Sequence, residues 1–240
     1  MKKEYVVITG GSQGIGAGIV SRLSDDGYQP IILDQAEPAQ RVDAEFHKID
    51  LFDAMATTNL MTEIASTFPA TRLINNVGIV RPALLENCSI EDFNQVMQLN
   101  AQTALICVKA LVPLMRKQKF GRIVSITSRT VLGKELRTAY SASKGAMAAM
   151  TRTWALELAA DGITVNAVAP GPIETEAFKK NNPLYDPHTQ AIVNGIPVKR
   201  LGTPADVAQA VSFFLDKKSE FITGQTLYVC GGLTIGLNTI

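Results

Sequence analysis

Residues 5–16, YVVITGGSQGIG, join an apolar, β-rich run to a glycine-rich turn, and a helical pattern follows from Ile15 to Leu23. This order predicts a strand, a tight turn and a helix. The first N–H groups of a helix have no partner within it, so such a turn can bind a pyrophosphate, and glycines let the backbone approach closely. The alternative is a tight turn without a ligand. The predicted nucleotide site comprises Gly10, Ser12, Gln13, Gly14, Ile15 and Gly16.

Asp34 follows a second apolar run, residues 31–33, and lies 18 residues after Gly16. An acidic residue at about this offset accepts hydrogen bonds from the adenosine ribose of NAD. Its carboxylate would repel the 2′-phosphate of NADP, and positions 12, 13 and 35 hold no Arg or Lys to bind that phosphate. The sequence therefore favours NAD over NADP, unless Asp34 only terminates the strand.

Apolar strand runs alternate with helical patterns along the chain. Strands are expected at 5–8, 31–33, 46–51, 72–75, 122–127, 163–168 and 225–229, and helices at 15–23, 53–68, 90–116, 139–160 and 205–215. Apolar strands separated by helices indicate a parallel sheet covered on both faces. We predict an α/β fold, a Rossmann-type doubly wound parallel sheet of about seven strands, in a single domain over 1–240. Residues 171–195 contain three prolines and weak periodicity, so we predict an irregular substrate lid there.

The composition excludes several classes of protein. Lys and Arg total 23 against 22 Asp and Glu, without a basic run, so no nucleic-acid partner is expected. Three dispersed cysteines and two distant histidines predict neither disulfides nor a bound metal, which fits a reducing cytoplasm. The apolar stretch near the start of the chain is too short for the hydrophobic region of a signal peptide. The most apolar helix, 101–115, contains Lys109 and Pro113, so no membrane span is expected.

Tyr140-Ser141-Ala142-Ser143-Lys144 begins the expected helix 139–160. The i, i+4 spacing puts Tyr140 and Lys144 on one face, one turn apart. A nearby ammonium lowers the pKa of a tyrosine, which is about 10 when free. Such a pair can exchange a proton with an alcohol or a carbonyl. Ser128, at the end of the preceding strand, could bind the substrate oxygen, and Ser125 and Thr127 are alternatives on the opposite strand face.

The ordered motifs resemble those of the short-chain dehydrogenase/reductase family, classical type, over essentially the whole chain. They are Thr9-Gly10-x-x-x-Gly14-Ile15-Gly16, Asp50-Leu51, Asn75-Asn76-Val77-Gly78, Asn100, Ser128, Tyr140-x-x-x-Lys144, Pro170-Gly171-Pro172-Ile173-x-Thr175, Phe221-Ile222-Thr223-Gly224-Gln225 and Gly231-Gly232. The whole set is far more specific than any one motif. The resemblance implies an NAD(P)-dependent oxidoreductase acting on CH–OH groups, cytoplasmic and assembled as a homotetramer or homodimer.

The resemblance also implies a role for each matching residue. Tyr140 would be the general acid/base, Lys144 would bind the nicotinamide ribose and lower the pKa of Tyr140, and Ser128 would bind the substrate oxygen. Asn100 would anchor a water that relays protons through Lys144. The remaining cofactor contacts would come from Ser12, Gln13 and Ile15 at the pyrophosphate, Asp50, Leu51, Asn76 and Gly78 around the adenosine, and Ile173 and Thr175 at the carboxamide.

Two arginines are candidates for binding an anionic substrate group. Arg137 precedes Tyr140 by three residues, and Arg81 follows the Asn-Val-Gly turn. Either could bind a carboxylate or phosphate through its guanidinium, and a solvated surface arginine is the alternative. Strand alternation predicts that Arg129 points away from the site. The lid would add apolar walls from Phe178, Leu184 and Tyr185.

Three functions follow from these observations. The first is hydride transfer between NAD(H) and a secondary alcohol or ketone of a small substrate, with Tyr140 as general acid/base. The second is NADPH-dependent reduction of a 3-oxoacyl thioester on an acyl-carrier protein, for which a basic residue is expected where Gln13 stands. The third is a non-catalytic, cofactor-binding regulator, which the intact set of Ser128, Tyr140 and Lys144 disfavours.

Overall fold

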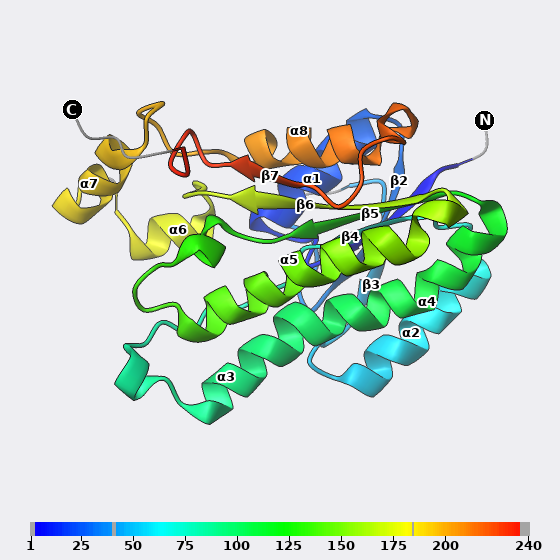
Figure 1. Cartoon of the computed structure of the whole chain (residues 1–240), viewed down its shortest axis with the longest axis horizontal. Helices are drawn as coiled ribbons and strands as arrows, with labels where there is room; N and C mark the ends of the chain where they lie inside the picture. Colours follow the sequence, from blue (N-terminus) through cyan, green and yellow to red (C-terminus); the bar gives the residue numbers. More distant parts are fainter. Residues whose placement is uncertain (1–2, 40–41, 184, 236–240) are drawn as a thin grey trace.

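Seven parallel strands form one sheet in the order β3-β2-β1-β4-β5-β6-β7 within residues 3–39, 42–183 and 185–235, the parts of the chain that a computed structural model describes (Figure 1). The strands are β1 (Tyr5–Thr9), β2 (Gln29–Asp34), β3 (Glu45–Lys48), β4 (Arg72–Asn75), β5 (Gly121–Ile126), β6 (Ile163–Pro170) and β7 (Thr226–Val229). The larger helices are α1 (Gly14–Asp25), α2 (Ala54–Thr67), α3 (Ile90–Met97), α4 (Thr103–Gln118), α5 (Thr138–Leu158) and α8 (Pro204–Leu215). The predicted fold class is confirmed.

The order of the strands reverses at β1. The chain runs outward from β1 to β2 and β3, and then returns to place β4 on the other side of β1. The helices that follow β1 and β4 therefore leave in opposite directions, which opens a crevice at the carboxyl ends of these two strands. The segments that follow β1 and β4 are the glycine turn and residues 76–78, two of the motifs that predicted a nucleotide site.

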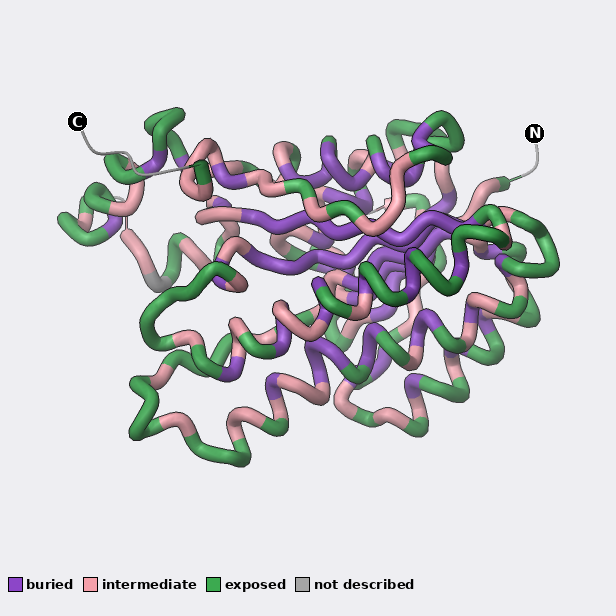
Figure 2. The backbone as a smooth tube through the Cα atoms, in the orientation of Figure 1, coloured by how far each residue is buried: buried purple, intermediate pink, exposed green. Residues whose placement is uncertain are grey.

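Each face of the sheet has its own apolar core. Val7 of β1 packs with side chains of α2, α4 and α5, whereas its neighbours Val6 and Ile8 pack with α1 and α8. This division follows from the alternation of side chains along a strand. The central strands are buried, and the exposed residues of the helices lie on their outer faces (Figure 2). The sheet is thus the middle layer of three (Figure 1).

The predicted helix 90–116 forms as one continuous helical run that contains a π-helical turn. The run consists of α3, the π-helix η2 (Gln98–Gln102) and α4. Among the described residues, Ile90–Gln118 is the one helix long and apolar enough to cross a membrane, but 56% of its most apolar window is buried inside the protein. Such burial is typical of a core helix. π-turns occur frequently at functional sites, and this one contains Asn100.

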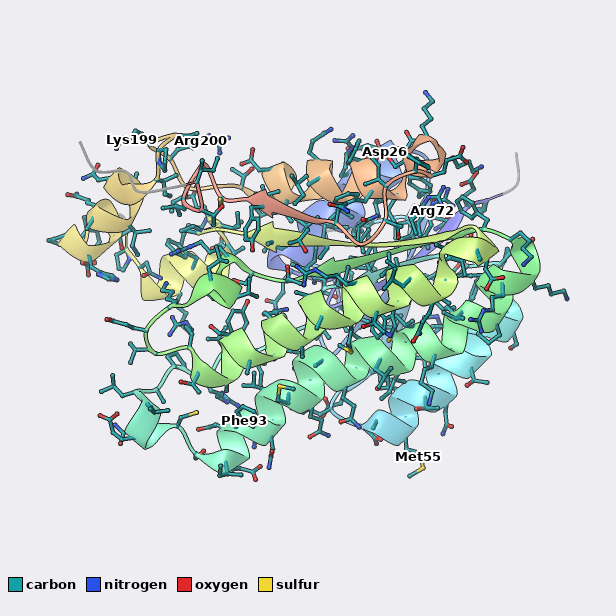
Figure 3. All side chains as sticks on the ribbon, in the orientation of Figure 1. Asp26, Met55, Arg72, Phe93, Lys199 and Arg200 are labelled. Carbon is teal, nitrogen blue, oxygen red and sulfur yellow. The ribbon has the colours of Figure 1, made fainter. Side chains whose placement is uncertain are left out.

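Two buried arginines at the opposite end of the sheet were not anticipated from the sequence. Arg72 is the first residue of β4 and Arg122 the second residue of the adjacent β5, and the two are paired in register. Arg122 donates to the carbonyl oxygens of Asp216 and Lys217, and Arg72 donates to that of Leu215. Both therefore satisfy carbonyls at and just beyond the end of α8, where a positive charge is favourable. Figure 3 shows Arg72 near the start of the chain, far from α6 and α7.

The segment predicted as an irregular lid contains two short helices. These are α6 (Glu176–Asn181) and α7 (Pro187–Gly195). The weak apolar periodicity of the segment did not predict these helices. Each begins at a residue whose side chain caps it. Thr175 accepts a hydrogen bond from Phe178 N, and Asp186 accepts one from His188 N. In Figure 1 both helices lie at the edge of the molecule to which β5, β6 and β7 point.

Candidate active site

The glycine turn between β1 and α1 leaves the start of α1 open. The side chain of Gln13, the N-cap residue, makes no capping hydrogen bond. Gly14 has φ +56°, and a Cβ on Gly16 would lie 1.9 Å from the carbonyl oxygen of Gly10, so the helix packs directly on the turn. Ser12 Oγ is buried and has no hydrogen-bond partner among the described residues. Free N–H groups and an unpaired hydroxyl fit the pyrophosphate of a dinucleotide.

The turn after β4 is fastened to the glycine turn. The Asn76 side-chain nitrogen donates to the carbonyl oxygens of Thr9 and Gly10 at 3.1 and 2.7 Å. In return, the Thr9 hydroxyl accepts from the backbone N–H groups of Asn76 and Val77 at 3.0 and 3.2 Å. Asn76 therefore holds the two sides of the crevice at a fixed separation.

The two predicted acidic residues lie at the carboxyl ends of neighbouring strands, Asp34 as the last residue of β2 and Asp50 just after β3. Asp34 Oδ2 accepts a hydrogen bond from Ser12 N at 3.0 Å, so the carboxylate at the end of β2 lies against the glycine turn. Asp50 Oδ1 accepts from Gln35 Nε2 at 2.6 Å and from Phe52 N at 3.0 Å. The turn at Asp50 ends β3 earlier than predicted. Leu51 is buried and packs into the core, so only its backbone could face an adenine.

Ser128, Tyr140 and Lys144 converge at the carboxyl end of β5. The Tyr140 hydroxyl and the Ser128 hydroxyl share a hydrogen bond. Lys144 Nζ lies 5.7 Å from the centre of the Tyr140 ring and donates to Ile126 O at 2.7 Å. The Lys144 side chain is 2% exposed, and this burial lowers its pKa to about 8. The competing hydroxyls have other partners: Ser125 accepts from the Asn75 side chain, and Thr127, although it lines the same cavity, donates to Val168 O.

The pKa of Tyr140 differs from the sequence-based expectation. Burial raises the pKa of the phenol above its usual value, and this effect outweighs the hydrogen bond with Ser128 and the charge of Arg137, which both lower it. The expected lowering by Lys144 is not among these effects. The prediction was wrong because the i, i+4 spacing fixes the face of the helix but not the depth of burial or the direction of the ammonium.

Asn100 binds the backbone of the segment after β4. Its Oδ1 accepts from Ile79 N at 2.8 Å, and its Nδ2 donates to Ile79 O at 3.0 Å and to Ser143 Oγ at 3.0 Å. Ser143 in turn donates to Tyr140 O. A Cβ on Gly78 would lie 3.0 Å from Asn100 Oδ1 and 3.4 Å from Lys144 Nζ. A side chain at this position would therefore require Asn100 or Lys144 to shift by a few tenths of an ångström.

A cavity of about 720 Å³ connects the cluster with the crevice and with α6 and α7. The predicted site residues in its lining are Ile15, Asn76, Gly78, Ser128, Arg137, Tyr140, Lys144, Ile173 and Thr175. Those outside the lining are Gly10, Ser12, Gln13, Gly14, Gly16, Asp34, Asp50, Leu51, Asn100 and Arg81. The lining residues that sequence reasoning did not propose include Lys134, Asn182, His188 and Ile192.

Several substrate expectations are corrected by this lining. Arg81 does not line the cavity, and its Nε lies 3.5 Å from Asp92 Oδ1. Arg129 does line it, because the 3-10 helix η3 (Arg129–Leu132) begins there and strand alternation no longer applies. Phe178 contributes a wall as expected, whereas Tyr185 is exposed and lies outside the lining. Leu184 lies outside the described residues.

This geometry matches a known family. The family model described as enoyl-(acyl carrier protein) reductase matches residues 10–234. The chain belongs to the short-chain dehydrogenase/reductase family. It is therefore an oxidoreductase, as the ordered motifs predicted.

Relatives within the short-chain dehydrogenase/reductase family match nearly the whole chain. A (2S)-[(R)-hydroxy(phenyl)methyl]succinyl-CoA dehydrogenase subunit of Thauera aromatica is 33% identical over 98% of both chains. A 3-oxoacyl-[acyl-carrier-protein] reductase of Rickettsia bellii is 35% identical over 96% of both. A solved structure of a putative NAD(P) dependent gluconate 5-dehydrogenase from Beutenbergia cavernae, with bound NADP, superposes with a TM-score of 0.91 at 30% identity over 97% of both.

No group of three or more His, Cys, Asp or Glu side chains that could hold a metal ion occurs in the described ranges. The titratable side chains that line the cavity are mostly basic and phenolic, with one carboxylate: Arg129, Lys134, Glu135, Arg137, Tyr140, Lys144 and His188. Such a set suits proton transfer and anion binding.

Proposed function

We propose that this chain transfers a hydride between NAD(H) and a secondary alcohol or ketone of a small substrate, with Tyr140 as general acid/base. The observation that carries the proposal is the hydrogen-bonded pair of Ser128 and Tyr140 beside the buried Lys144, on the wall of a cavity that continues into the nucleotide crevice. When bound, the dinucleotide supplies or accepts the hydride. The side chains of the protein position the substrate and donate or accept the proton.

The proton moves through the Tyr140 hydroxyl. A substrate oxygen that enters between the Ser128 and Tyr140 hydroxyls can accept a hydrogen bond from each. In reduction, Tyr140 donates its proton to the carbonyl oxygen, and in oxidation its phenolate accepts the proton of the alcohol. The high pKa of Tyr140 favours the protonated, donating form at neutral pH.

Lys144 is suited to assist by position and charge. Its ammonium is fixed by Ile126 O and lies between the Tyr140 ring and Gly78, where a ribose hydroxyl could accept from it. An ammonium here favours the phenolate over the phenol once substrate and cofactor exclude water. Asn100 lies outside the cavity lining and fixes the backbone of Ile79, and we propose it as an anchor of the proton path rather than as a group that touches substrate.

The proposed function is tested by a paired assay of NAD and NADP over secondary alcohols, diols and 3-oxoacyl thioesters. The absorbance of the reduced nicotinamide gives the rate. We expect turnover of at least one small secondary alcohol or its ketone. If no member of the panel is turned over while cofactor still binds, the regulator function replaces this proposal.

NAD is the proposed cofactor because of Asp34. Its carboxylate is fixed against Ser12 N, at the end of β2 where the adenosine ribose is expected, and a 2′-phosphate would meet this negative charge. The NADP bound to the gluconate 5-dehydrogenase relative argues for the opposite preference. Titration decides between the two. We expect NADH to bind at least about tenfold more tightly than NADPH, and equal affinities would remove the argument from Asp34.

Reduction of a 3-oxoacyl thioester is the second candidate function. It is favoured by 32–35% identity with several 3-oxoacyl-[acyl-carrier-protein] reductases over nearly the whole chain. Gln13, at a position where that function predicts a basic residue, argues against it. The thioester arm of the same panel, run with NADPH, separates the two functions.

We further propose a cytoplasmic homo-oligomer and a substrate lid at 171–195. Exposed apolar side chains on two long helices, Leu105 on α4 and Leu156 on α5, support a contact between subunits. Phe178, His188 and Ile192 support the lid because they line the cavity from α6 and α7. Light scattering of the purified chain tests the assembly.

A further inference from the structure

One wall of the cavity carries a concentration of positive charge. Arg129, Lys134 and Arg137 all belong to the segment between β5 and the Tyr140 helix, and all three line the cavity. The lining part of this segment contains one acidic residue, Glu135. In Figure 1 the segment lies beside α6, and both border the same cavity. Three cations against one carboxylate give this wall a net positive charge in a chain whose formal charge is +1.

These three cations lack the ion pairs that several other basic residues in the described part of the chain form. Arg22, Arg81, Arg116 and Arg200 each form an ion pair with an aspartate. Arg129, Lys134 and Arg137 have no carboxylate within ion-pair distance among the described residues, and the Arg137 guanidinium donates to the carbonyl oxygen of Leu136 at 3.0 Å. Their capacity to bind an anion is therefore unused within the protein.

The charges on this wall are close enough to act on one another. Burial lowers the pKa of Lys134, and the positive charges of Arg137 and Arg129 lower it further. Arg137 also lowers the pKa of Tyr140, which places its charge within electrostatic reach of the proposed acid/base. Gathering like charges without a counter-ion raises the free energy of the protein, and a bound oxyanion would relieve this repulsion.

We propose that Arg129, Lys134 and Arg137 bind a carboxylate or phosphate group of the substrate while Tyr140 acts on its carbonyl or hydroxyl oxygen. The proposal rests on the proposed function and narrows its substrate class to oxo and hydroxy acids or their phosphate counterparts. A guanidinium can bind either oxyanion through two parallel hydrogen bonds, and a lysine adds a point charge. Phe178 and Ile192, which line the same cavity from α6 and α7, are apolar and suit the carbon chain of such a substrate.

The test compares acids with their neutral derivatives. The substrates are straight-chain oxo acids that differ in the spacing of ketone and carboxylate, each paired with its methyl ester, and dihydroxyacetone phosphate paired with dihydroxyacetone. We expect kcat/KM for the best anion to exceed that of its neutral partner by at least about tenfold. The two arms distinguish a carboxylate from a phosphate. A ratio near one in every pair overturns the proposal.

Variants locate the effect on this wall. Arg137→Met and Lys134→Met are each expected to reduce the anion-to-neutral ratio by about fivefold or more, and the ratio cancels any effect on Tyr140 that both substrates share. The matched control is Arg81→Met, which removes a nearby arginine that is paired with Asp92 and lies outside the lining. If Arg81→Met and Arg137→Met lower the anion-to-neutral ratio equally, the preference for anions arises from the general positive charge near the cavity, and the proposed subsite is wrong.

A binding measurement separates this proposal from the catalytic one. Calorimetry with the saturated acid and its methyl ester, neither of which can react, needs no turnover. We expect the acid to bind at least about tenfold more tightly, with the difference lost in Arg137→Met. Equal binding of acid and ester overturns the subsite. Preferential acid binding without turnover of any ketone would support the subsite and contradict the proposed function.

Discussion

Lys144 is a buried cation without an acidic partner among the described residues. It donates to Ile126 O and lies 3.7 Å from Met147 Sδ, and burial alone lowers its pKa to about 8. The protein thus retains a residue whose charged form is costly, at the position where an ammonium beside Tyr140 is useful. Such residues serve function although they lower the stability of the folded state.

Lys144→Met is expected to make the protein more stable at pH 7 and to abolish turnover. A pKa lowered from 10.5 to about 8 corresponds to about 3 kcal/mol, and the lost bond to Ile126 O offsets part of it, so we expect a gain of about 1–3 kcal/mol. Because the folded-state pKa is the lower one, the penalty is fully present below pH 8 and disappears as pH rises to 10.5.

Urea unfolding of Lys144→Met and wild type between pH 7 and 10.5 measures this gain. The stability difference should shrink as pH rises through this window. Lys117→Met, which removes an exposed lysine from α4, is the control and should leave stability nearly unchanged. A Lys144→Met protein less stable than wild type at pH 7 would contradict the prediction.

Asp34→Asn is expected to weaken discrimination between the two cofactors. The amide keeps an oxygen that can accept from Ser12 N but removes the charge that would repel a 2′-phosphate. We expect the NADPH-to-NADH affinity ratio to rise by about tenfold, measured by titrating the fluorescence of the bound reduced cofactors. An unchanged ratio would mean that Asp34 only terminates β2.

At the scale of elements, the sequence predicted where helices and strands occur but not where they depart from regular helix or strand geometry. The helix 90–116 was predicted from its pattern, and in the structure Ser89 caps it by accepting from Asp92 N. Its π-turn was not predicted; Asn100, within this turn, binds Ile79, 21 positions away, a contact that no local pattern indicates. Arg129 was assigned to the wrong side for a similar reason, since η3 ends the strand alternation.

The two buried arginines show the same limit. Nothing local to Arg72 or Arg122 indicates that both are buried, because their partners at the end of α8 lie 94 or more positions along the chain. The local pattern predicted strands with an ordinary charged first residue. Burial here results from tertiary packing, in which cations satisfy the last carbonyls of a helix.

Arg122→Met should destabilise the fold by about 2 kcal/mol. The change keeps apolar volume on Phe120 but leaves the carbonyl oxygens of Asp216 and Lys217 without their donor. Urea unfolding at pH 7 measures the loss, and Arg152→Met, an exposed position on α5, is the matched control. A change within about 0.5 kcal/mol of the control would show that these contacts contribute little.

At the scale of the whole molecule, the alternation of strands and helices was enough to predict one doubly wound sheet. Several site motifs directly follow predicted strands. Because the carboxyl ends of parallel strands meet at one edge of the sheet, these motifs could be expected to lie close together. The cationic wall was not predicted as a unit. Arg137 alone was proposed from the sequence as an anion-binding residue of this wall, whereas Arg129 was expected to point away and Lys134 was not considered. Only the path of the segment around the cavity brings the three charges together.

The most direct test of the account is the single-turnover rate of hydride transfer in Tyr140→Phe, with cofactor affinity measured on the same protein. The change removes only the hydroxyl that shares a hydrogen bond with Ser128. We predict that the rate falls by about a thousandfold, as expected for loss of a general acid/base, while the affinity for NADH changes by less than about threefold. A rate within about tenfold of wild type would contradict the assignment of Tyr140 and with it the proposed mechanism.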